Sequence, residues 1–235
     1  MPALLNGCRE DEIQSLALAG NEFPAGQLGA RLIADELARL QGFAAELRPQ
    51  LAATPLPAAH ASFDYPLDGE NWQLAGALGD LRPAGLLRYR YDDLRPADYL
   101  TGWINHLFLC AMSPPGVAPQ TAWYSRDGSY RLTACEPATA RVCLGELIAL
   151  YRRGLSQPLH FFPKSAWAYA NSRQNGLADA RRRWNNSRNE AWGEAADPAF
   201  KLALRGVAEP LDEAFAACAR TVFGPLLEHL EEYRR

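Results

Sequence analysis

The sequence contains very little lysine, because only Lys164 and Lys201 accompany 22 arginines. Both lysines lie far in sequence from the apolar strand segments, so those segments carry no lysine side chain. A GxxxxGK phosphate-binding loop is also absent, which argues against ATP hydrolysis. With a net charge of -3 the chain as a whole does not attract nucleic acid, so any DNA contact must come from local basic patches.

The five cysteines are scattered, without a C-x-x-C pair and without a histidine at ligand spacing. We therefore expect no metal site and no cofactor, and buried free thiols at Cys110 and Cys218. Neither a secretory signal nor an apolar run long enough to cross a bilayer is present, so we expect a cytoplasmic protein without membrane contact. With 235 residues, 48% of them hydrophobic, the chain can bury a substantial core.

The stretch from Trp72 to Leu109 organises the predicted fold. Alternating apolar residues predict strands at Trp72–Asp80 and Gly85–Tyr91, joined by a turn at Arg82–Gly85. Pro96 then opens a helix with a continuous apolar face. An apolar strand pair that leads into an amphipathic helix is typical of the core of a domain.

The rest of the chain predicts further helices around this element, with one more clear hairpin. Before it we expect a helix at 27–47, a weak helical patch at 13–19 and a strand at 61–65 that joins the sheet at one edge. After it we expect strands at 120–125 and 129–135 around the turn Arg126-Asp127-Gly128, then a helix at 138–153. The remaining expected helices are 165–183, 197–203 and 211–234, with Pro225 kinking or restarting the last one.

This layout resembles the restriction-endonuclease-like nuclease domains that end RecB-type and AddB-type DNA-processing enzymes. The resemblance implies a metal-binding aspartate on the first strand and an acidic-x-lysine pair on the second. At the matching positions this sequence has Gly79, Arg88 and Arg90, and arginines cannot ligate a divalent cation. The histidine that active relatives place on the 27–47 helix is also missing near residues 29–31. We therefore expect an inactivated nuclease domain.

Within this group the sequence resembles the C-terminal domain of RecC, the gamma subunit of exodeoxyribonuclease V. The resemblance rests on Leu-Gly-Glu-Leu-x-x-Leu-Tyr at 144–151, on the run FFPKSAWAY at 161–169 and on Val-Phe-Gly-Pro-Leu-Leu at 222–227. It implies a restriction-endonuclease-like α/β fold, a mixed sheet flanked by helices with a helical C-terminal annex. We expect a lead-in from a preceding domain at 1–23, a nuclease-like core at 24–156 and the annex at 157–235, all forming the last part of a much larger subunit.

The function implied by the resemblance is non-catalytic. As part of a RecBCD helicase-nuclease in double-strand break repair and recombination, the domain would hold RecB-like and RecD-like partners and guide double-stranded DNA at a fork or end. The complex is an ATP-dependent exodeoxyribonuclease, but no active site is expected in this chain. Two alternatives remain open: a divergent active metal-dependent nuclease that uses Asp80, Asp92, Asp93 and Glu146, and a protein-interaction module that never contacts DNA.

Candidate site residues fall into basic and aromatic sets. The candidate DNA-binding residues are Arg88, Arg90, Arg126, Arg131, Lys164, Arg181, Arg182 and Arg183. Arg88 and Arg90 could equally pair with Asp80, Asp92 or Asp93, and the run at 181–183 could be a solvated helix face. Phe161, Phe162 and Trp167 are expected in the core or at a partner interface rather than stacked on bases. The hairpin at Asp127 is either a strand-splitting pin, as the resemblance implies, or an ordinary sheet hairpin.

Overall fold

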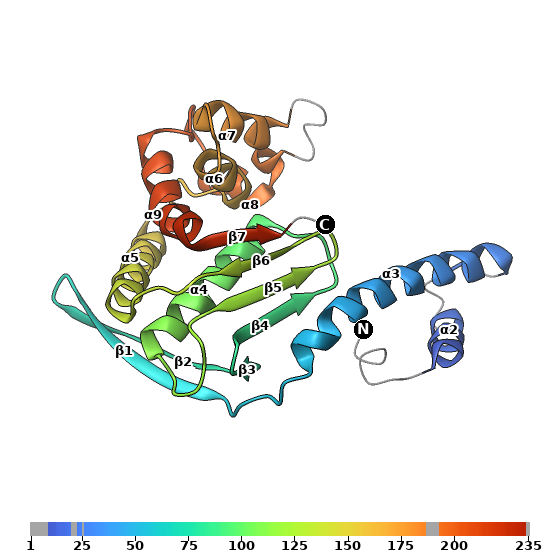
Figure 1. Cartoon of the computed structure of the whole chain (residues 1–235). Helices are drawn as coiled ribbons and strands as arrows, with labels where there is room; N and C mark the ends of the chain where they lie inside the picture. The colour runs from blue at the N-terminus through green and yellow to red at the C-terminus, as the bar shows by residue number, and fades with distance from the viewer. Residues whose placement is uncertain (1–8, 20–22, 25, 187–192, 234–235) are drawn as a thin grey trace.

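The computed structural model describes residues 9–19, 23–24, 26–186 and 193–233 of the chain. A five-stranded mixed sheet carries helices on both faces, and further helices form an annex beside it (Figure 1). The predicted α/β class, a mixed sheet flanked by helices, is therefore confirmed. The restriction-endonuclease-like identity of the fold and the boundaries at 23 and 156 stay predictions.

The central sheet has the strand order β3-β4-β5-β6-β7. Its strands are β3 (Leu81–Arg82), β4 (Gly85–Arg90), β5 (Thr121–Ser125), β6 (Ser129–Leu132) and β7 (Leu230–Tyr233). The β4–β5 pair is parallel and the other pairs are antiparallel. A parallel pair needs a crossover connection, and helix α4 (Pro96–Met112) provides it.

Two hairpins of this sheet follow the predicted turns. The β5–β6 hairpin turns at residues 126–128, with Tyr124 opposite Ser129. The β3–β4 hairpin turns at Pro83 and Ala84, with Arg82 opposite Gly85. Gly85 has a φ of 124°, and a Cβ there would collide with the carbonyl oxygen of Gln120, so only glycine fits this close approach.

The pairing predicted for the strand at 72–80 is wrong. Strand β2 (Glu70–Leu78) pairs with β1 (Ala59–Leu67) in a separate two-stranded sheet, and β1 does not join the main sheet as the edge strand predicted at 61–65. Asp68 and Gly69 both have positive φ, which suits a two-residue turn between β1 and β2. Asp80, with a φ of 57°, then interrupts the extended chain before the short β3.

The main hydrophobic core lies on the face of the sheet that α4 covers. Helix α4 covers one face with Trp103 and Leu107 almost fully buried, and α5 (Pro137–Ser156) packs beside it. The C-terminal part of helix α3 (Gln27–Leu51) lies near β4 on the other side, where Phe43 meets Tyr91 with ring centroids 5.4 Å apart, and α2 (Glu10–Ala19) packs on α3. The helices predicted at 13–19, 27–47 and 138–153 are confirmed, each slightly longer than expected.

The annex consists of α6 (Pro163–Ala170), α7 (Gly176–Asn185), the short helix η2 (Glu194–Ala196), α8 (Pro198–Ala203) and α9 (Glu213–His229). The helix predicted at 165–183 is interrupted between α6 and α7, where Asn175 caps the start of α7. Helix α9 continues through Pro225. The helix predicted to reach residue 234 is wrong beyond His229, because residues 230–233 pair with β6 as strand β7.

Candidate functional site

Arg88 and Arg90 alternate along β4 with Leu87 and Tyr89, so they point to the face of the sheet that α4 covers. The Arg88 Nη1 atom donates to Asp80 Oδ2 at 3.0 Å and to the carbonyl oxygen of Gly79 at 3.4 Å. A guanidinium group therefore lies at the position where the resemblance placed a metal-binding side chain. Asp80 is present there, but its carboxylate is held by an arginine.

Arg90 reaches the first turn of α4. Its Nη2 atom donates to Asp98 Oδ2 at 2.6 Å, and the same oxygen accepts the backbone N–H of Arg95 at 2.8 Å. The Asp98 side chain is only 9% exposed, and the positive end of the helix dipole adds to its stabilisation. Arg90 also lies 3.8 Å from Asp92.

The same network extends to the turn of the β5–β6 hairpin. Arg126 pairs with Asp93 at 2.7 Å, and Arg95 pairs with Asp92 at 2.7 Å. Asp127 accepts the backbone N–H of Leu94. We call this set the Arg–Asp network: Arg88, Arg90, Arg95 and Arg126 with Asp80, Asp92, Asp93, Asp98 and Asp127.

Each of the four arginines of the Arg–Asp network is paired with an aspartate, and the fifth aspartate, Asp127, accepts a backbone N–H. The backbone N–H of Asp93 donates a hydrogen bond to the Asp92 carboxylate. This bond lowers the pKa of Asp92, and nearby arginines lower it further. The hydrogen bond to Asp93 raises the pKa of Arg126. Both shifts favour the charged forms, so a phosphate or a metal ion at this place would have to displace existing ion pairs.

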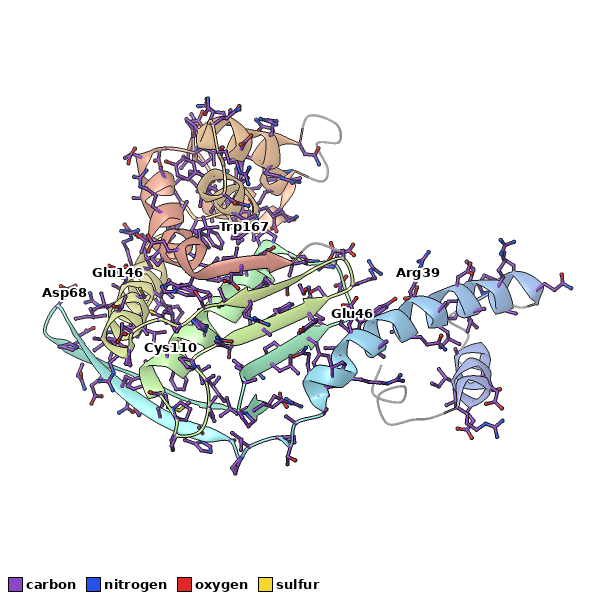
Figure 2. The ribbon with its side chains drawn as sticks, viewed as in Figure 1. Arg39, Glu46, Asp68, Cys110, Glu146 and Trp167 are labelled. Carbon is purple, nitrogen blue, oxygen red and sulfur yellow. The ribbon has the colours of Figure 1, made fainter. Side chains whose placement is uncertain are left out.

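Carboxylates predicted for an active nuclease are not gathered around one point. Glu146 lies on α5 near Asp68 at the tip of the β1–β2 hairpin (Figure 2). Both residues line a cavity of about 770 Å³. Asp80, Asp92 and Asp93 do not line that cavity. Within residues 9–19, 23–24, 26–186 and 193–233, no group of three or more histidine, cysteine or acidic side chains is arranged to hold a metal ion. Cys8 lies outside these residues.

The arginines of α7 differ from those of the Arg–Asp network because they are on an exposed helix surface. Arg181 lies 3.4 Å from Glu209, and Arg182 lies 2.5 Å from Asp179. Arg183 is exposed and has no ion pair with any residue in the described part of the chain. This helix therefore presents the exposed basic surface predicted at 181–183. Acidic residues balance only part of its positive charge.

The two remaining basic candidates lie apart from each other. Arg131 is on β6, in register with Glu231 of β7. Lys164 is in the first turn of α6, where its backbone N–H donates to the buried carboxylate of Glu194 at 3.0 Å. Because these residues are on different elements, the predicted basic residues form several local patches rather than one continuous groove.

The aromatic residues predicted for the core or a partner interface connect the annex to the rest of the chain. Phe162 is completely buried, 4.3 Å from Trp184 between ring centroids, so the core alternative holds for it. Trp167 stacks on Tyr99 of α4 at 4.1 Å, and Figure 2 shows it between the annex and the sheet. Partner contact by Trp167 or Phe161 stays a prediction.

The hairpin at Asp127 is built as an ordinary part of the sheet. Its strands pair with β4 on one side and β7 on the other. Trp123 and Tyr130 are buried, and the Tyr130 hydroxyl donates to the carbonyl oxygen of Asp98 at 2.9 Å. These contacts hold the hairpin on both sides, which favours the ordinary hairpin over a free-standing pin.

The fold and the Arg–Asp network together define the class of protein. It is a mixed α/β domain in which arginines form ion pairs with the carboxylates beside the sheet. The family model for the RecC C-terminal domain matches residues 1–174, and the chain belongs to this family. The chain is 28% identical over 162 residues to the RecBCD enzyme subunit RecC of Escherichia coli (strain K12). That similarity covers 69% of this chain but 14% of the relative, so the chain spans a small part of that protein's length.

The family match stops short of the exposed arginines. It ends at residue 174, and α7 begins at Gly176. The Arg–Asp network lies within the matched segment. Asp98, the most buried carboxylate of the network, was missing from the sequence-based candidates. Its position three residues after Arg95 at the start of a helix is the sequence signal that could have indicated it.

Proposed function

We propose that this chain is a non-catalytic domain of a RecC-like subunit in a RecBCD-type helicase-nuclease that acts in double-strand break repair. It holds RecB-like and RecD-like partner subunits and guides the double-stranded DNA that the complex unwinds in the cytoplasm. Membership of the RecC C-terminal domain family is the observation that carries this proposal. None of the helices in the described ranges is long and apolar enough to cross a membrane.

The Arg–Asp network supports a structural role at the place where the resemblance expects nuclease chemistry. Its ion pairs join β4, the start of α4 and the β5–β6 hairpin. Such a network fixes the relative positions of three elements, and partly buried pairs resist separation. DNA guidance is then assigned to the exposed arginines of α7, because their contacts with phosphates cost no buried ion pair.

DNA binding tests the guide role. A triple variant with Arg181→Gln, Arg182→Gln and Arg183→Gln should bind a labelled duplex more weakly than the unmodified chain and with a salt dependence reduced by about one power of salt concentration per lost contact. The matched control is Arg31→Gln with Arg39→Gln and Arg48→Gln, which removes the same charge from exposed positions of α3. Fluorescence anisotropy at low and moderate salt measures both. Equal weakening by the two triple variants would contradict a specific DNA surface on α7.

Reconstitution with the RecB-like and RecD-like subunits tests the scaffold role. Co-elution of the three components in size-exclusion chromatography supports it, and co-elution without any DNA binding by this chain would favour the pure interaction module. Magnesium-dependent or manganese-dependent cleavage of linear DNA that Asp80→Ala abolishes would instead establish the active-nuclease alternative.

A further inference from the structure

A buried arginine without a counter-charge lies at the β3–β4 hairpin. Arg82 is only 7% exposed, yet none of the carboxylates in the described ranges lies within ion-pair distance of its guanidinium group. Within the described part of the chain, its Nη1 atom donates to the carbonyl oxygen of Asp80 at 3.3 Å, and its Nε atom is buried without a partner. Arg82 therefore differs from Arg88 and Arg90, whose charges are matched within the chain.

An arginine cannot remove its buried positive charge by losing a proton, since its pKa lies far above neutral pH. A buried lysine or histidine can become neutral, but a buried guanidinium stays charged and needs an anion. Among the described residues no carboxylate lies beside Arg82, so this guanidinium group is free to accept a counter-charge from outside the chain.

Arg82 lines a cavity that has room for such an anion. The cavity has a volume of about 110 Å³, whereas a single water molecule needs roughly 10–15 Å³ on this measure. Besides Arg82, the long polar residues that line it are Gln50 at the end of α3, Gln120 just before β5 and Arg131 of β6. Thr121 also borders it, but its hydroxyl lies 3.1 Å from His106 on the α4 side of the sheet. No acidic residue of the described ranges lines it.

The backbone around the cavity is held in place before any ligand binds. The carbonyl oxygen of Pro83 accepts the N–H of Ala118 at 2.9 Å, and Leu86 donates its N–H to Gln120 at 2.9 Å. Gly85 lies against the Gln120 carbonyl without room for a Cβ. A rigid hairpin reduces the conformational entropy that the protein loses when a ligand binds.

We propose that this cavity binds one phosphate group, with Arg82 as its principal positive partner and Gln50, Gln120 and Arg131 as further donors. These donors come from four separate segments and surround the cavity, which suits a tetrahedral anion with several acceptor oxygens better than a planar carboxylate. The phosphate is either free or part of a DNA backbone. This site is separate from the α7 arginines, and its occupancy is measured without DNA or partner subunits.

Phosphate binding to the 235-residue chain provides the test. Isothermal titration with sodium phosphate, in buffer held at constant ionic strength with sodium chloride, should show saturable binding by the unmodified chain. Arg82→Met should weaken the phosphate affinity at least tenfold. The control Arg220→Met, which removes an exposed charge on α9, should leave it within twofold. No saturable binding by the unmodified chain, or equal affinity in Arg82→Met, would overturn the proposal.

A second variant keeps the test decisive if Arg82→Met does not fold. Gln50→Glu places a carboxylate at the cavity with almost no change in side-chain shape, so it should supply the missing counter-charge. We expect a higher melting temperature without phosphate and at least a tenfold loss of phosphate affinity. Unchanged phosphate affinity in Gln50→Glu contradicts the site.

Two further titrations identify the ligand. Acetate that binds as tightly as phosphate would overturn the assignment to phosphate and favour a carboxylate from a partner protein. In a competition experiment, phosphate that displaces a labelled DNA duplex from the unmodified chain, but not from Gln50→Glu, identifies a DNA phosphate as the source. Phosphate binding that leaves DNA affinity unchanged identifies free phosphate.

Discussion

His106 is a fully buried histidine on α4, and its ring nitrogens both have partners. Nε2 lies 2.9 Å from the carbonyl oxygen of Thr133, and Nδ1 lies 3.1 Å from the Thr121 hydroxyl. This arrangement suits a neutral ring that donates from Nε2 and accepts at Nδ1. Burial lowers the pKa of His106 to about 4, with a smaller lowering from the nearby His229.

The lowered pKa of His106 predicts acid sensitivity in a defined range. Well above pH 6.5 the ring is neutral in both the folded and the unfolded chain, so it causes no pH dependence there. As the pH falls from 6.5 towards 4, the unfolded chain binds a proton that the folded chain excludes, and the free energy of unfolding falls by up to about 3 kcal/mol. Urea unfolding of the wild type and His106→Gln between pH 7.5 and 4.5 measures this difference.

The matched control is His60→Gln, which changes an exposed histidine on β1. It should follow the wild-type pH dependence, whereas the gap between the wild type and His106→Gln should shrink as the pH falls. A gap that stays constant from pH 7.5 to 4.5 contradicts the assignment to His106.

The positions of Arg88 and Arg90 were partly predictable from the sequence. Their spacing placed both side chains on one face of a strand, and pairing with aspartates was one of the two alternatives considered. The choice between the alternatives depends on Asp80 and Asp98, which reach the arginines only through the turn at Asp80 and the start of α4. Hydrophobic periodicity carries no information about such contacts.

At the scale of elements, α4 and β6 approach each other unusually closely at Gly102. A Cβ at this position would overlap the hydroxyl oxygen of Tyr130 and lie 3.0 Å from its Cζ atom. Tyr130 cannot move away easily, because it is 1% exposed and its hydroxyl is bonded to the Asp98 carbonyl. Gly102 therefore sets the distance between the helix and the sheet.

Gly102→Ala should lower the free energy of unfolding by about 2 kcal/mol or more, since overpacking in a rigid core costs roughly 1–3 kcal/mol. The control is Gly42→Ala on α3, where a Cβ meets no atom within 4 Å. In that helix alanine should stabilise by up to about 1 kcal/mol. Denaturant unfolding compares the two, and a loss of the same size at both positions would contradict the steric explanation.

The β1–β2 hairpin shows why strand pairing was harder to predict than the strands themselves. Extended segments near 61–65 and 72–80 were both recognised from the sequence. Their alternation does not say which neighbour a strand pairs with, and the apolar match between 72–80 and 85–91 favoured the wrong partner. The backbone of Asp80, with positive φ, decides the outcome, and a non-glycine residue rarely signals that conformation.

At the scale of the whole molecule, the annex and the sheet share one hydrophobic core. Phe215, Val222 and Leu226 of α9 belong to the same buried cluster as Leu86, Trp103 and Leu132. The chain then returns from α9 to the sheet, where Leu230 lies opposite Leu132. The end of the predicted helix at 211–234 was wrong for this reason, since a tertiary contact with β6 overrides the helix-forming residues near its end.

Removal of residues 230–235 should therefore affect the entire domain. The truncated chain loses β7, exposes β6 as an unpaired edge and leaves Leu132 partly uncovered, so we expect a loss of about 2 kcal/mol or more and concentration-dependent association. Removal of residues 234–235 alone is the control. Thermal unfolding and size-exclusion chromatography compare the two chains, and identical behaviour would show that β7 contributes nothing to the sheet.

The aromatic rings between the sheet and the annex form a continuous series, stacked from Trp123 to Trp167 and edge-to-face at Phe223. Successive centroid distances are 6.0 Å from Trp123 to Tyr130, 4.8 Å from Tyr130 to Tyr99, 4.1 Å from Tyr99 to Trp167 and 5.2 Å from Trp167 to Phe223. Rings this close couple their electronic transitions, and their near-ultraviolet circular dichroism depends on fixed packing. The protein thus contains its own optical reporter, whose signal is lost when the annex separates from the sheet, without any added label.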